Sequence, residues 1–213
     1  MMKKNLRNLS LAALSIVLFT QCSKDASSPV ANYSPLTAGS NWTYKYTEGN
    51  ASSTFKLTAT NRDTVANGKT YKVLTSSEGT STYLSKVGND YYRFAALPTI
   101  GVFEELYLMD NKAVNETWTG TTTFKYGTSD VTANRTYTIK GKGESRTVNG
   151  KSFSNVTHVR LDISVFGFAV GGGDFYYQEG VGLIDDTISV TPPAILGGQP
   201  YNSSQGIVSY EIK

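Results

Sequence analysis

Short runs in which apolar and polar residues alternate recur along most of the chain, and they constrain its fold more than any other feature. In the run 42–47 three aromatic residues alternate with Thr and Lys, and in the run 159–165 four aliphatic residues alternate with Arg160, Asp162 and Ser164. Because successive side chains of a strand point to opposite faces, each run predicts a strand with one buried and one exposed face. No window longer than about ten residues shows a helical period. We therefore expect an all-β fold.

The turns between these runs predict hairpins. Asn67-Gly68 and Asn149-Gly150 each lie between β-type segments. Asn-Gly is the strongest short hairpin signal, because a type I′ turn requires positive φ at both central positions. The sequence thus predicts an antiparallel curved sheet or a partly closed β-barrel, built as a meander of hairpins.

Three pairs of similar segments raise the question of an internal repeat. The matched pairs are Trp42 with Trp118, the Asn-Gly-Lys turn at Asn67 with the one at Asn149, and Tyr91-Tyr92 with Tyr176-Tyr177. Their offsets of 76, 82 and 85 residues drift by small steps, as insertions in loops would produce. Two similar halves are one interpretation. Chance is the other, because Asn-Gly turns and Tyr pairs are common in β proteins.

The N-terminus has the features of a secretion signal. Lys3, Lys4 and Arg7 precede an apolar stretch over residues 9–20. This stretch is shorter than the about 20 residues that a membrane-spanning helix needs, and it matches the apolar region of a signal peptide. We expect residues 1–21 to be removed.

Cys22 is the only cysteine and lies just after this stretch, separated from it by Gln21 alone. The segment before it resembles the lipobox of bacterial lipoproteins, although residues 19–21 depart from the usual Leu-Ala-Gly. The resemblance implies that Cys22 carries a lipid anchor; a free thiol or an intermolecular disulfide is the alternative. Residues 22–34 would then be the lipidated cysteine and a flexible tether, and residues 35–213 a single β domain.

The expected location is the outer membrane, with the chain held there by its lipid. Ser23-Lys24-Asp25 resembles the short tag that sends some Bacteroidota lipoproteins to the cell exterior. This resemblance favours surface exposure over a periplasm-facing position.

The charge of the chain argues against a nucleic-acid partner. Removal of residues 1–21 takes away three of the twenty Lys and Arg residues and none of the seventeen Asp and Glu residues. The remaining chain carries seventeen charges of each sign. It therefore has no basic excess for nucleic acid and no polybasic membrane patch.

Few residues could support catalysis. His158 is the only histidine, and its alternation with Arg160 places it on the polar face of its strand. We expect it to be exposed and paired with Asp162 or a cross-strand partner. No G-x-S-x-G motif occurs, and Cys and His are too few for a zinc site. We therefore expect no catalytic residue, metal or cofactor, and no enzymatic activity.

Two pairs of adjacent acidic residues, Glu104-Glu105 and Asp185-Asp186, are the remaining candidates for catalytic or metal-binding residues. Adjacent residues of a strand point to opposite faces, so neither pair forms a ready-made site. We expect both pairs in solvated edges and turns. A Ca²⁺ site with oxygen ligands or a glycosidase carboxylate pair is the alternative, although neither has a recognisable motif here.

The stretch VFGFAVGGGD ends an apolar strand and runs into three glycines. We expect a buried strand that ends in a loose, flexible glycine turn. The alternative is a mobile apolar loop at the mouth of the barrel, a gate at which Phe166, Phe168 and Val170 contact an apolar ligand. Trp42 and Tyr44 are the other candidates for ligand contact, because their flat faces and polar groups suit stacking on sugars or contact with proteins.

Two motifs resemble a known group of proteins. Residues 35–44 follow the pattern P-L-x-x-G-x-x-W-x-Y, and residues 176–184 follow Y-Y-x-x-G-V-G-L-I. Both resemble the start and end of uncharacterised Bacteroidota outer-membrane lipoproteins. The resemblance implies an antiparallel sheet, curved or partly closed, somewhat like the half-barrels of lipoprotein carriers, and it implies no reaction.

From these observations we expect a membrane-anchored, non-catalytic binding or scaffold module of the cell envelope, with an envelope protein or a glycan as its partner. The alternative is a carrier or chaperone for a lipid or other apolar ligand in the concave face of the sheet. An interior filled by side chains would exclude the carrier, whereas an apolar cavity of several hundred Å³ would favour it.

Overall fold

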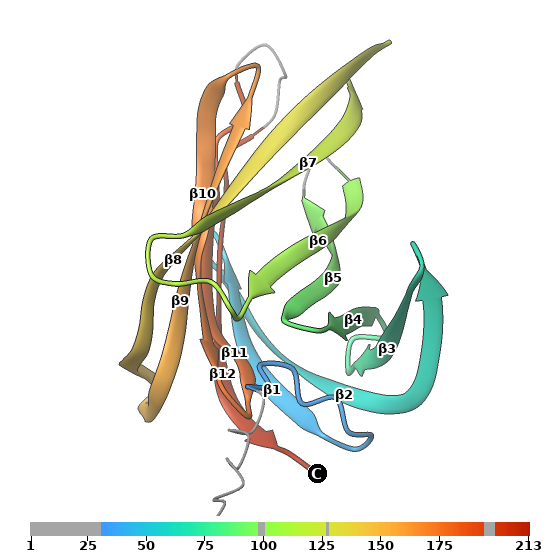
Figure 1. The fold of residues 1–213 in the computed structure, drawn as a ribbon, viewed down its shortest axis with the longest axis vertical. Helices are drawn as coiled ribbons and strands as arrows, with labels where there is room; N and C mark the ends of the chain where they lie inside the picture. Colours follow the sequence, from blue (N-terminus) through green and yellow to red (C-terminus); the bar gives the residue numbers. More distant parts are fainter. Residues whose placement is uncertain (1–30, 98–100, 127, 194–198) are drawn as a thin grey trace, which may run out of the picture. The chain divides into compact units, whose positions relative to one another are not determined.

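The computed structural model describes residues 31–97, 101–126, 128–193 and 199–213, without the side chains of residues 97 and 126. These residues form one antiparallel sheet of twelve strands that curls into a nearly closed barrel (Figure 1). The all-β prediction is confirmed. In the part of the chain described, no helix has the length and apolar character needed to cross a membrane.

The strands follow the sequence in short succession. They are β1 (Asn41–Glu48), β2 (Ala51–Ala66), β3 (Lys69–Ser76), β4 (Ser81–Val87), β5 (Asp90–Leu97), β6 (Gly101–Met109), β7 (Thr117–Tyr126), β8 (Ser129–Val148), β9 (Lys151–Val165), β10 (Phe168–Gln178), β11 (Gly182–Val190) and β12 (Tyr201–Glu211).

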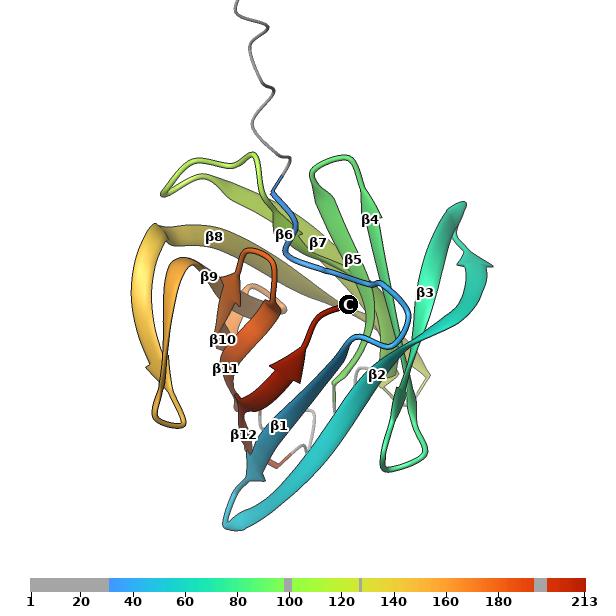
Figure 2. The ribbon, with the colours of Figure 1, turned by 90° about the horizontal axis from the view of Figure 1, so that it is seen from below.

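The sheet order is β6-β5-β4-β3-β2-β1-β12-β11-β10-β9-β8-β7. Every pair of adjacent strands in this order, except the pair β1 and β12, is also consecutive in sequence. The sheet is therefore an up-and-down meander whose first and last strands also pair with each other. The first strand pairs with the last, from Asn41 opposite Glu211 to Glu48 opposite Ser203. Figure 2 shows the strands arranged around the barrel interior. The only consecutive strands that are not paired in this order are β6 and β7, which are its two edges.

Side chains bridge the two edges where the backbone ladder is interrupted. The indole Nε1 of Trp118, on β7, donates a hydrogen bond of 2.8 Å to the carbonyl oxygen of Leu106 on β6. The hydroxyl of Tyr137, on β8, donates to Oε1 of Glu105 at 2.7 Å. The rings of Trp118 and Tyr137 stack with their centroids 5.2 Å apart. These contacts close the barrel at the edge that backbone pairing leaves open.

Both predicted Asn-Gly hairpins form. Asn67 and Gly68 have φ values of 49° and 72° between β2 and β3, and Asn149 and Gly150 have 47° and 79° between β8 and β9. Positive φ at both central residues is the type I′ geometry that fits the right-handed twist of the flanking strands.

Two of the three matched pairs occupy equivalent places in the two halves of the barrel, β1–β6 and β7–β12. Trp42 and Trp118 lie in the first strand of each half, and the two Asn-Gly turns join the second strand of each half to the third. The Tyr pairs do not correspond, because Tyr91 lies in the fifth strand of its half and Tyr176 in the fourth.

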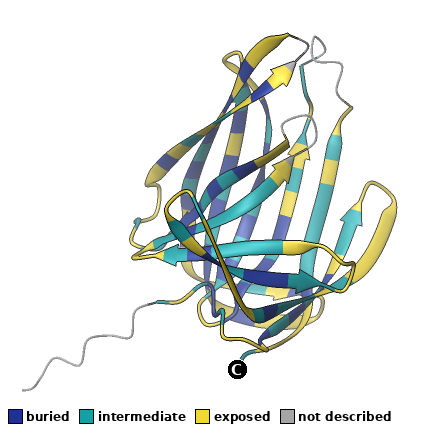
Figure 3. Cartoon of the chain, turned by 90° about the vertical axis from the view of Figure 1, so that its right-hand side faces the viewer, coloured by how far each residue is buried: buried dark blue, intermediate teal, exposed yellow. Residues whose placement is uncertain are grey.

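The alternation of apolar and polar residues predicts which side chains are buried. In β9, Val159, Leu161, Ile163 and Val165 are all buried, whereas Asp162 between them is exposed. Figure 3 shows the same banding of buried and exposed residues along neighbouring strands. The inward faces supply two clusters of buried apolar side chains, one centred on β8–β10 and one on β1, β9 and β12.

The glycine-rich stretch 165–174 differs from the expected flexible turn. The turn consists of Phe166 and Gly167 only, and the three glycines lie inside β10. A Cβ atom at Gly172 would clash with the carbonyl oxygen of Leu161, and one at either neighbouring glycine would clash with the backbone of β11. The glycines therefore permit close approach of adjacent strands rather than chain mobility.

Residues 31–40, hereafter the strap, run across one end of the barrel before β1 begins (Figure 2). The carbonyl oxygen of Ala31 accepts hydrogen bonds from Lys86 Nζ at 2.6 Å and from the hydroxyl of Tyr91 at 3.0 Å. Farther along, the hydroxyl of Thr157 pairs with that of Tyr33 at 3.1 Å. The last four residues of the predicted tether, 31–34, belong to this strap.

Candidate functional site

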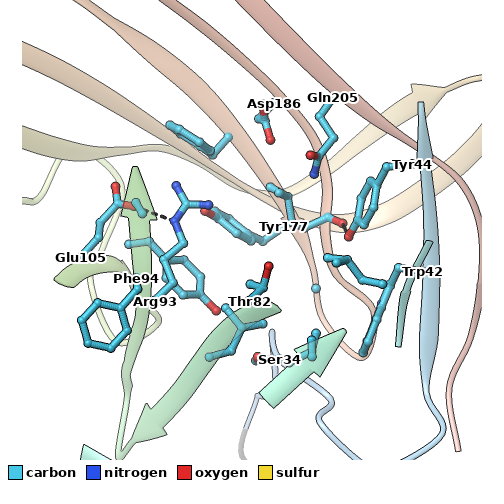
Figure 4. A pocket seen from close by; sticks show the side chains of 18 of the residues that line it. Ser34, Trp42, Tyr44, Thr82, Arg93, Phe94, Glu105, Tyr177, Asp186 and Gln205 are labelled. Atoms are coloured by element: carbon cyan, nitrogen blue, oxygen red, sulfur yellow. Dashed lines mark hydrogen bonds and ion pairs between the residues drawn. The ribbon is translucent and has the colours of Figure 1, made fainter. Parts of the chain in front are cut away.

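A cavity of about 320 Å³ lies inside the barrel. It is lined by the strap and by strands β1–β6 and β9–β12 (Figure 4). Most of the lining is apolar or aromatic, because the inward positions of these strands carry the apolar half of each alternating run. These side chains include Trp42, Tyr44, Phe55, Leu57, Leu74, Leu84, Phe94, Phe103, Leu161, Phe175 and Ile188.

The strap supplies part of the cavity wall. Tyr33, Ser34, Pro35 and Leu36 all line the cavity. Ser34 is buried, and Leu36 packs against the cluster that contains the β1 aromatic residues. The strap therefore covers one end of the apolar interior.

A buried ion pair forms one polar wall of the cavity. Arg93 on β5 and Glu105 on β6 are directly opposite in the sheet, and Arg93 Nε donates to Glu105 Oε2 at 2.6 Å. Tyr137 donates to the other carboxylate oxygen. Burial alone raises the pKa of Glu105, but Arg93 and Tyr137 outweigh it and hold this pKa below its usual value. Glu105 is therefore ionised, and each of its two carboxylate oxygens accepts a hydrogen bond from a protein side chain.

A second arginine lies behind this pair. Arg135 donates from Nη1 to the hydroxyl of Tyr137 at 3.2 Å and from Nη2 to the carbonyl oxygen of Thr121 at 3.1 Å. Its guanidinium lies 4.2 Å from the ring centroid of Phe103. Tyr137 thus accepts from Arg135 and donates to Glu105, which links both arginines to one carboxylate.

Asp186 is a buried carboxylate on β11 without a fixed partner. Figure 4 shows its side chain above the cavity, on the same side as Gln205. The structure records no hydrogen bond to this carboxylate among the described residues. Burial raises the pKa of Asp186 to about 7. The negative charges of Asp185 and Glu105 also raise this pKa, whereas the positive charge of Arg93 lowers it.

The expectation that both acidic pairs lie in solvated positions is wrong for one member of each. Glu105 and Asp186 are buried, whereas their neighbours turn outward, where Glu104 pairs with Lys69 and Asp185 with Arg146. Strand alternation causes this division. For Glu105 a signal was available, because it shares a face with the aromatic residues two positions before and after it.

Two buried hydroxyls in the lining have no partner. Ser34 Oγ and Tyr177 Oη make no hydrogen bond among the described residues. The two terminal nitrogens of Arg93 likewise make none within the described chain, where only its Nε is engaged. Since buried polar groups are normally paired, the two hydroxyls mark where the polar atoms of a ligand or of water fit, and the terminal nitrogens of the partly exposed Arg93 offer further donors.

The structure brings two of the five proposed ligand-contact residues together and leaves three outside the cavity. Trp42 and Tyr44 line the cavity, and each donates its polar hydrogen to a carbonyl, of Val181 and Leu183 respectively, at 2.8 Å. The remaining three lie elsewhere: Phe166 and Phe168 are exposed, at 54% and 71%, and Val170 is buried in the core but does not line the cavity.

His158 lies in a polar ladder on the outer face of the barrel. Its Nε2 pairs at 2.8 Å with Oδ1 of Asp174 on the neighbouring strand β10, and its ring stacks on Tyr176, the residue opposite it in the sheet, with centroids 4.4 Å apart. Arg160 also pairs with Asp174, at 2.8 Å. Across the ranges described, no three His, Cys, Asp or Glu side chains gather in a way that could hold a metal ion.

The predicted signal peptide, residues 1–21, and the lipidation residue Cys22 lie outside the described residues.

Comparison with known proteins does not assign the chain to a family. No family model matches it, and no curated protein sequence matches it. A crystal structure from Parabacteroides distasonis, described as a "putative lipoprotein", shares 11% identity over 85% of this chain and 99% of its own, with a TM-score of 0.49. A "putative exported protein with YmcC-like fold" from Bacteroides fragilis shares 8% identity over the same fractions, with a TM-score of 0.42.

Proposed function

We propose that the protein is a non-catalytic binding protein that holds a small amphipathic molecule inside its barrel. The observation that carries this proposal is the interior cavity, which is apolar over most of its lining and has unpaired polar groups on its walls. Of the two functions expected from the sequence, this one corresponds to the carrier rather than the scaffold.

The size of the cavity supports a ligand. Protein interiors are close-packed, with few voids larger than a water molecule. An engineered apolar cavity of about 150 Å³ already binds benzene. At about 320 Å³, this cavity lies at the lower end of the range of small-molecule sites, about 300 to 1,000 Å³. A single-chain amphiphile or a small aromatic molecule of similar volume is the class of ligand that fits.

The hydrogen bonds that Glu105 accepts support a binding function without catalysis. Two carboxylates whose pKa values are displaced in opposite directions, as those of Glu105 and Asp186 are, could serve as a base and an acid. However, Glu105 accepts hydrogen bonds on both oxygens, from Arg93 and from Tyr137. It therefore has no oxygen free of a protein partner with which to attack a substrate or activate water.

The position of the aromatic residues argues against a glycan as the main partner. Sugar stacking needs accessible flat rings, but Trp42 and Trp118 are buried, at 4% and 8% exposure. Trp42 and Tyr44 turn their faces to the interior, where an apolar chain would contact them.

The proposal includes a location. We propose that Cys22 carries a lipid that anchors the barrel to the outer membrane, with the barrel exposed at the cell surface. The support is the basic and apolar N-terminal segment followed directly by a single cysteine. The ligand would then be a lipid or another apolar molecule of the envelope.

Saturable binding of the neutral fluorescent probe N-phenyl-1-naphthylamine tests the cavity. Leu57, on β2, lines the cavity, so Leu57→Trp fills part of it and should weaken probe binding at least tenfold. Val65, on the same strand and 73% exposed, provides the matched control, and Val65→Trp should bind as the wild type does. Circular dichroism establishes that both variants are folded. Absence of saturable binding to the wild type, or unchanged binding by Leu57→Trp, overturns the proposal.

A further inference from the structure

We propose that the ligand carries one negative charge, on a carboxylate that binds the free edge of the Arg93 guanidinium, and that Asp186 competes with it for Arg93. This inference rests on the proposed function and specifies the class of ligand. It follows from the hydrogen bonds that Arg93 leaves unmade, the charge balance of the polar wall, and the arrangement of polar and apolar lining.

Arg93 is built to receive a carboxylate. Only its Nε is engaged within the described chain, by Glu105, and its side chain keeps 20% of its surface exposed. The guanidinium lies 5.4 Å from the ring centroid of Tyr107 and 5.3 Å from that of Phe175, which restrict its plane. Its two terminal nitrogens present parallel N–H groups, and that geometry matches the two oxygens of a carboxylate.

The charges of this wall favour a single negative charge. Arg93 and Arg135 contribute two positive charges, and Glu105 neutralises one of them. With Asp186 protonated, one positive charge remains without a counter-ion. A monoanion would balance it, whereas a dianion such as a phosphate monoester would leave an excess negative charge in a buried site, at a high desolvation cost.

Further hydrogen-bond donors lie in the same cavity. Tyr177, from β10, is 2% exposed and its hydroxyl has no partner within the described residues. Figure 4 shows its side chain next to the Arg93 guanidinium. The hydroxyl of Ser34, from the strap, is also buried and makes no hydrogen bond to the part of the chain that the structure describes. Both hydroxyls can donate to an anionic oxygen or to a water bound to it.

The arrangement of polar and apolar lining indicates how the ligand is oriented in the cavity. In Figure 4 the Arg93–Glu105 pair lies on one side of the cavity, and Trp42 and Tyr44 lie on the opposite side. Leu57 and Phe55, on the neighbouring strand β2, extend this apolar side. A ligand with its carboxylate at Arg93 would therefore place its hydrocarbon against β1 and β2.

Asp186 makes binding depend on pH. The groups around it are Arg93 on β5, Glu105 on β6, Tyr44 on β1, Tyr177 on β10, Gln205 on β12, and Asp185 on its own strand. Its pKa is raised to about 7, so it is neutral at pH 6 and ionised at pH 8. Once ionised, it offsets the charge of Arg93 and repels a second carboxylate. Affinity for a monoanion should therefore fall about tenfold from pH 6 to pH 8.

Displacement of N-phenyl-1-naphthylamine by decanoate and by decan-1-ol, at pH 6 and pH 8, tests this inference. Decanoate is ionised at both values, since its pKa is that of an ordinary carboxylic acid. Wild-type protein should bind decanoate about tenfold more tightly at pH 6 than at pH 8, and decan-1-ol equally at both. Asp186→Asn should bind decanoate at pH 8 as tightly as the wild type does at pH 6.

A double variant tests the role of Arg93 without leaving the Glu105 carboxylate buried and unpaired. Arg93→Gln combined with Glu105→Gln removes both members of the ion pair. It should retain decan-1-ol binding and lose the preference for decanoate at pH 6. If decan-1-ol displaces the probe from the wild type but decanoate is no better at pH 6, the carboxylate inference fails and the proposed function stands. If the probe does not bind at all, both fail.

Discussion

Replacing Asp186 by Asn should change the pH dependence of folding stability in a defined direction. The pKa of this carboxyl is raised from 3.8 to about 7 in the folded protein, chiefly by burial. Between these two values the folded state binds a proton that the unfolded state does not. Stability must therefore fall as pH rises from about 4 to about 7 and level off above pH 7. Asparagine has no proton to lose, so the variant should not show this fall.

The magnitude follows from the size of the shift. A shift of one pKa unit corresponds to about 1.4 kcal/mol, so a rise from 3.8 to about 7 corresponds to at most about 4 kcal/mol at pH 8. Asp186→Asn should be more stable than the wild type by up to that amount at pH 8, and equal to it near pH 4. Glu105 does not obscure the effect, because its lowered pKa confines its own contribution to pH values below the usual 4.5.

Urea unfolding followed by tryptophan fluorescence, at several pH values between 4.5 and 8, measures the difference. Asp162→Asn is the matched control, since Asp162 is an exposed carboxylate on the outer face of β9 that pairs with Arg160. This control should keep the wild-type slope. Parallel pH profiles for Asp186→Asn and the wild type would refute the assignment of a buried, raised-pKa carboxylate.

Three further substitutions probe the fold. Tyr91→Phe should lower the free energy of unfolding by about 1 to 3 kcal/mol and speed hydrogen exchange in the strap, because its hydroxyl accepts from the backbone N–H of Tyr33 and shares its single proton between the carbonyl oxygen of Ala31 and Oδ2 of Asp110. Gly172→Ala should destabilise by about 3 kcal/mol or more, measured by thermal unfolding, since its Cβ would clash with the carbonyl oxygen of Leu161. Trp118→Phe should cost about 1 to 3 kcal/mol in urea unfolding and increase hydrogen exchange at the β6–β7 edges, because it removes one of the side-chain hydrogen bonds that close the barrel there.

The local features of the fold were predictable from the sequence because they depend on neighbouring residues. The alternation in 159–165 determines which face of β9 is buried, and the positive φ of Asn149 and Gly150 follows from the type of turn. The pairing of β1 with β12 was not predictable in this way. It joins residues 155 to 170 positions apart, and no local pattern specifies that register.

The candidate site was only partly predictable. Trp42 and Tyr44 were expected to contact a ligand on account of their aromatic rings, and they line the cavity. Glu105 and Asp186 were expected in solvent, because charged residues are almost never fully buried unless paired. The partner of Glu105 is Arg93, which no local pattern linked to it, since their pairing depends on the register of β5 and β6.

The error at the glycine-rich stretch has a specific physical cause. Glycine permits mobile turns and also permits close contact between strands, and sequence alone does not separate these uses. Here the deciding factor is the backbone of β9 and β11 on either side of Gly172. The exposed Phe166 therefore lies in a tight two-residue turn, and the exposed Phe168 directly follows that turn, so neither belongs to a mobile gate.

Native mass spectrometry of the protein purified from the cells that produce it, combined with analysis of extracted acyl compounds, tests the central claim most directly. The account predicts a complex with one small amphiphile per chain in the wild type and in Val65→Trp, and loss of that amphiphile in Leu57→Trp. A bare protein mass for the wild type, or an amphiphile that persists at full occupancy in Leu57→Trp, would contradict binding inside the barrel.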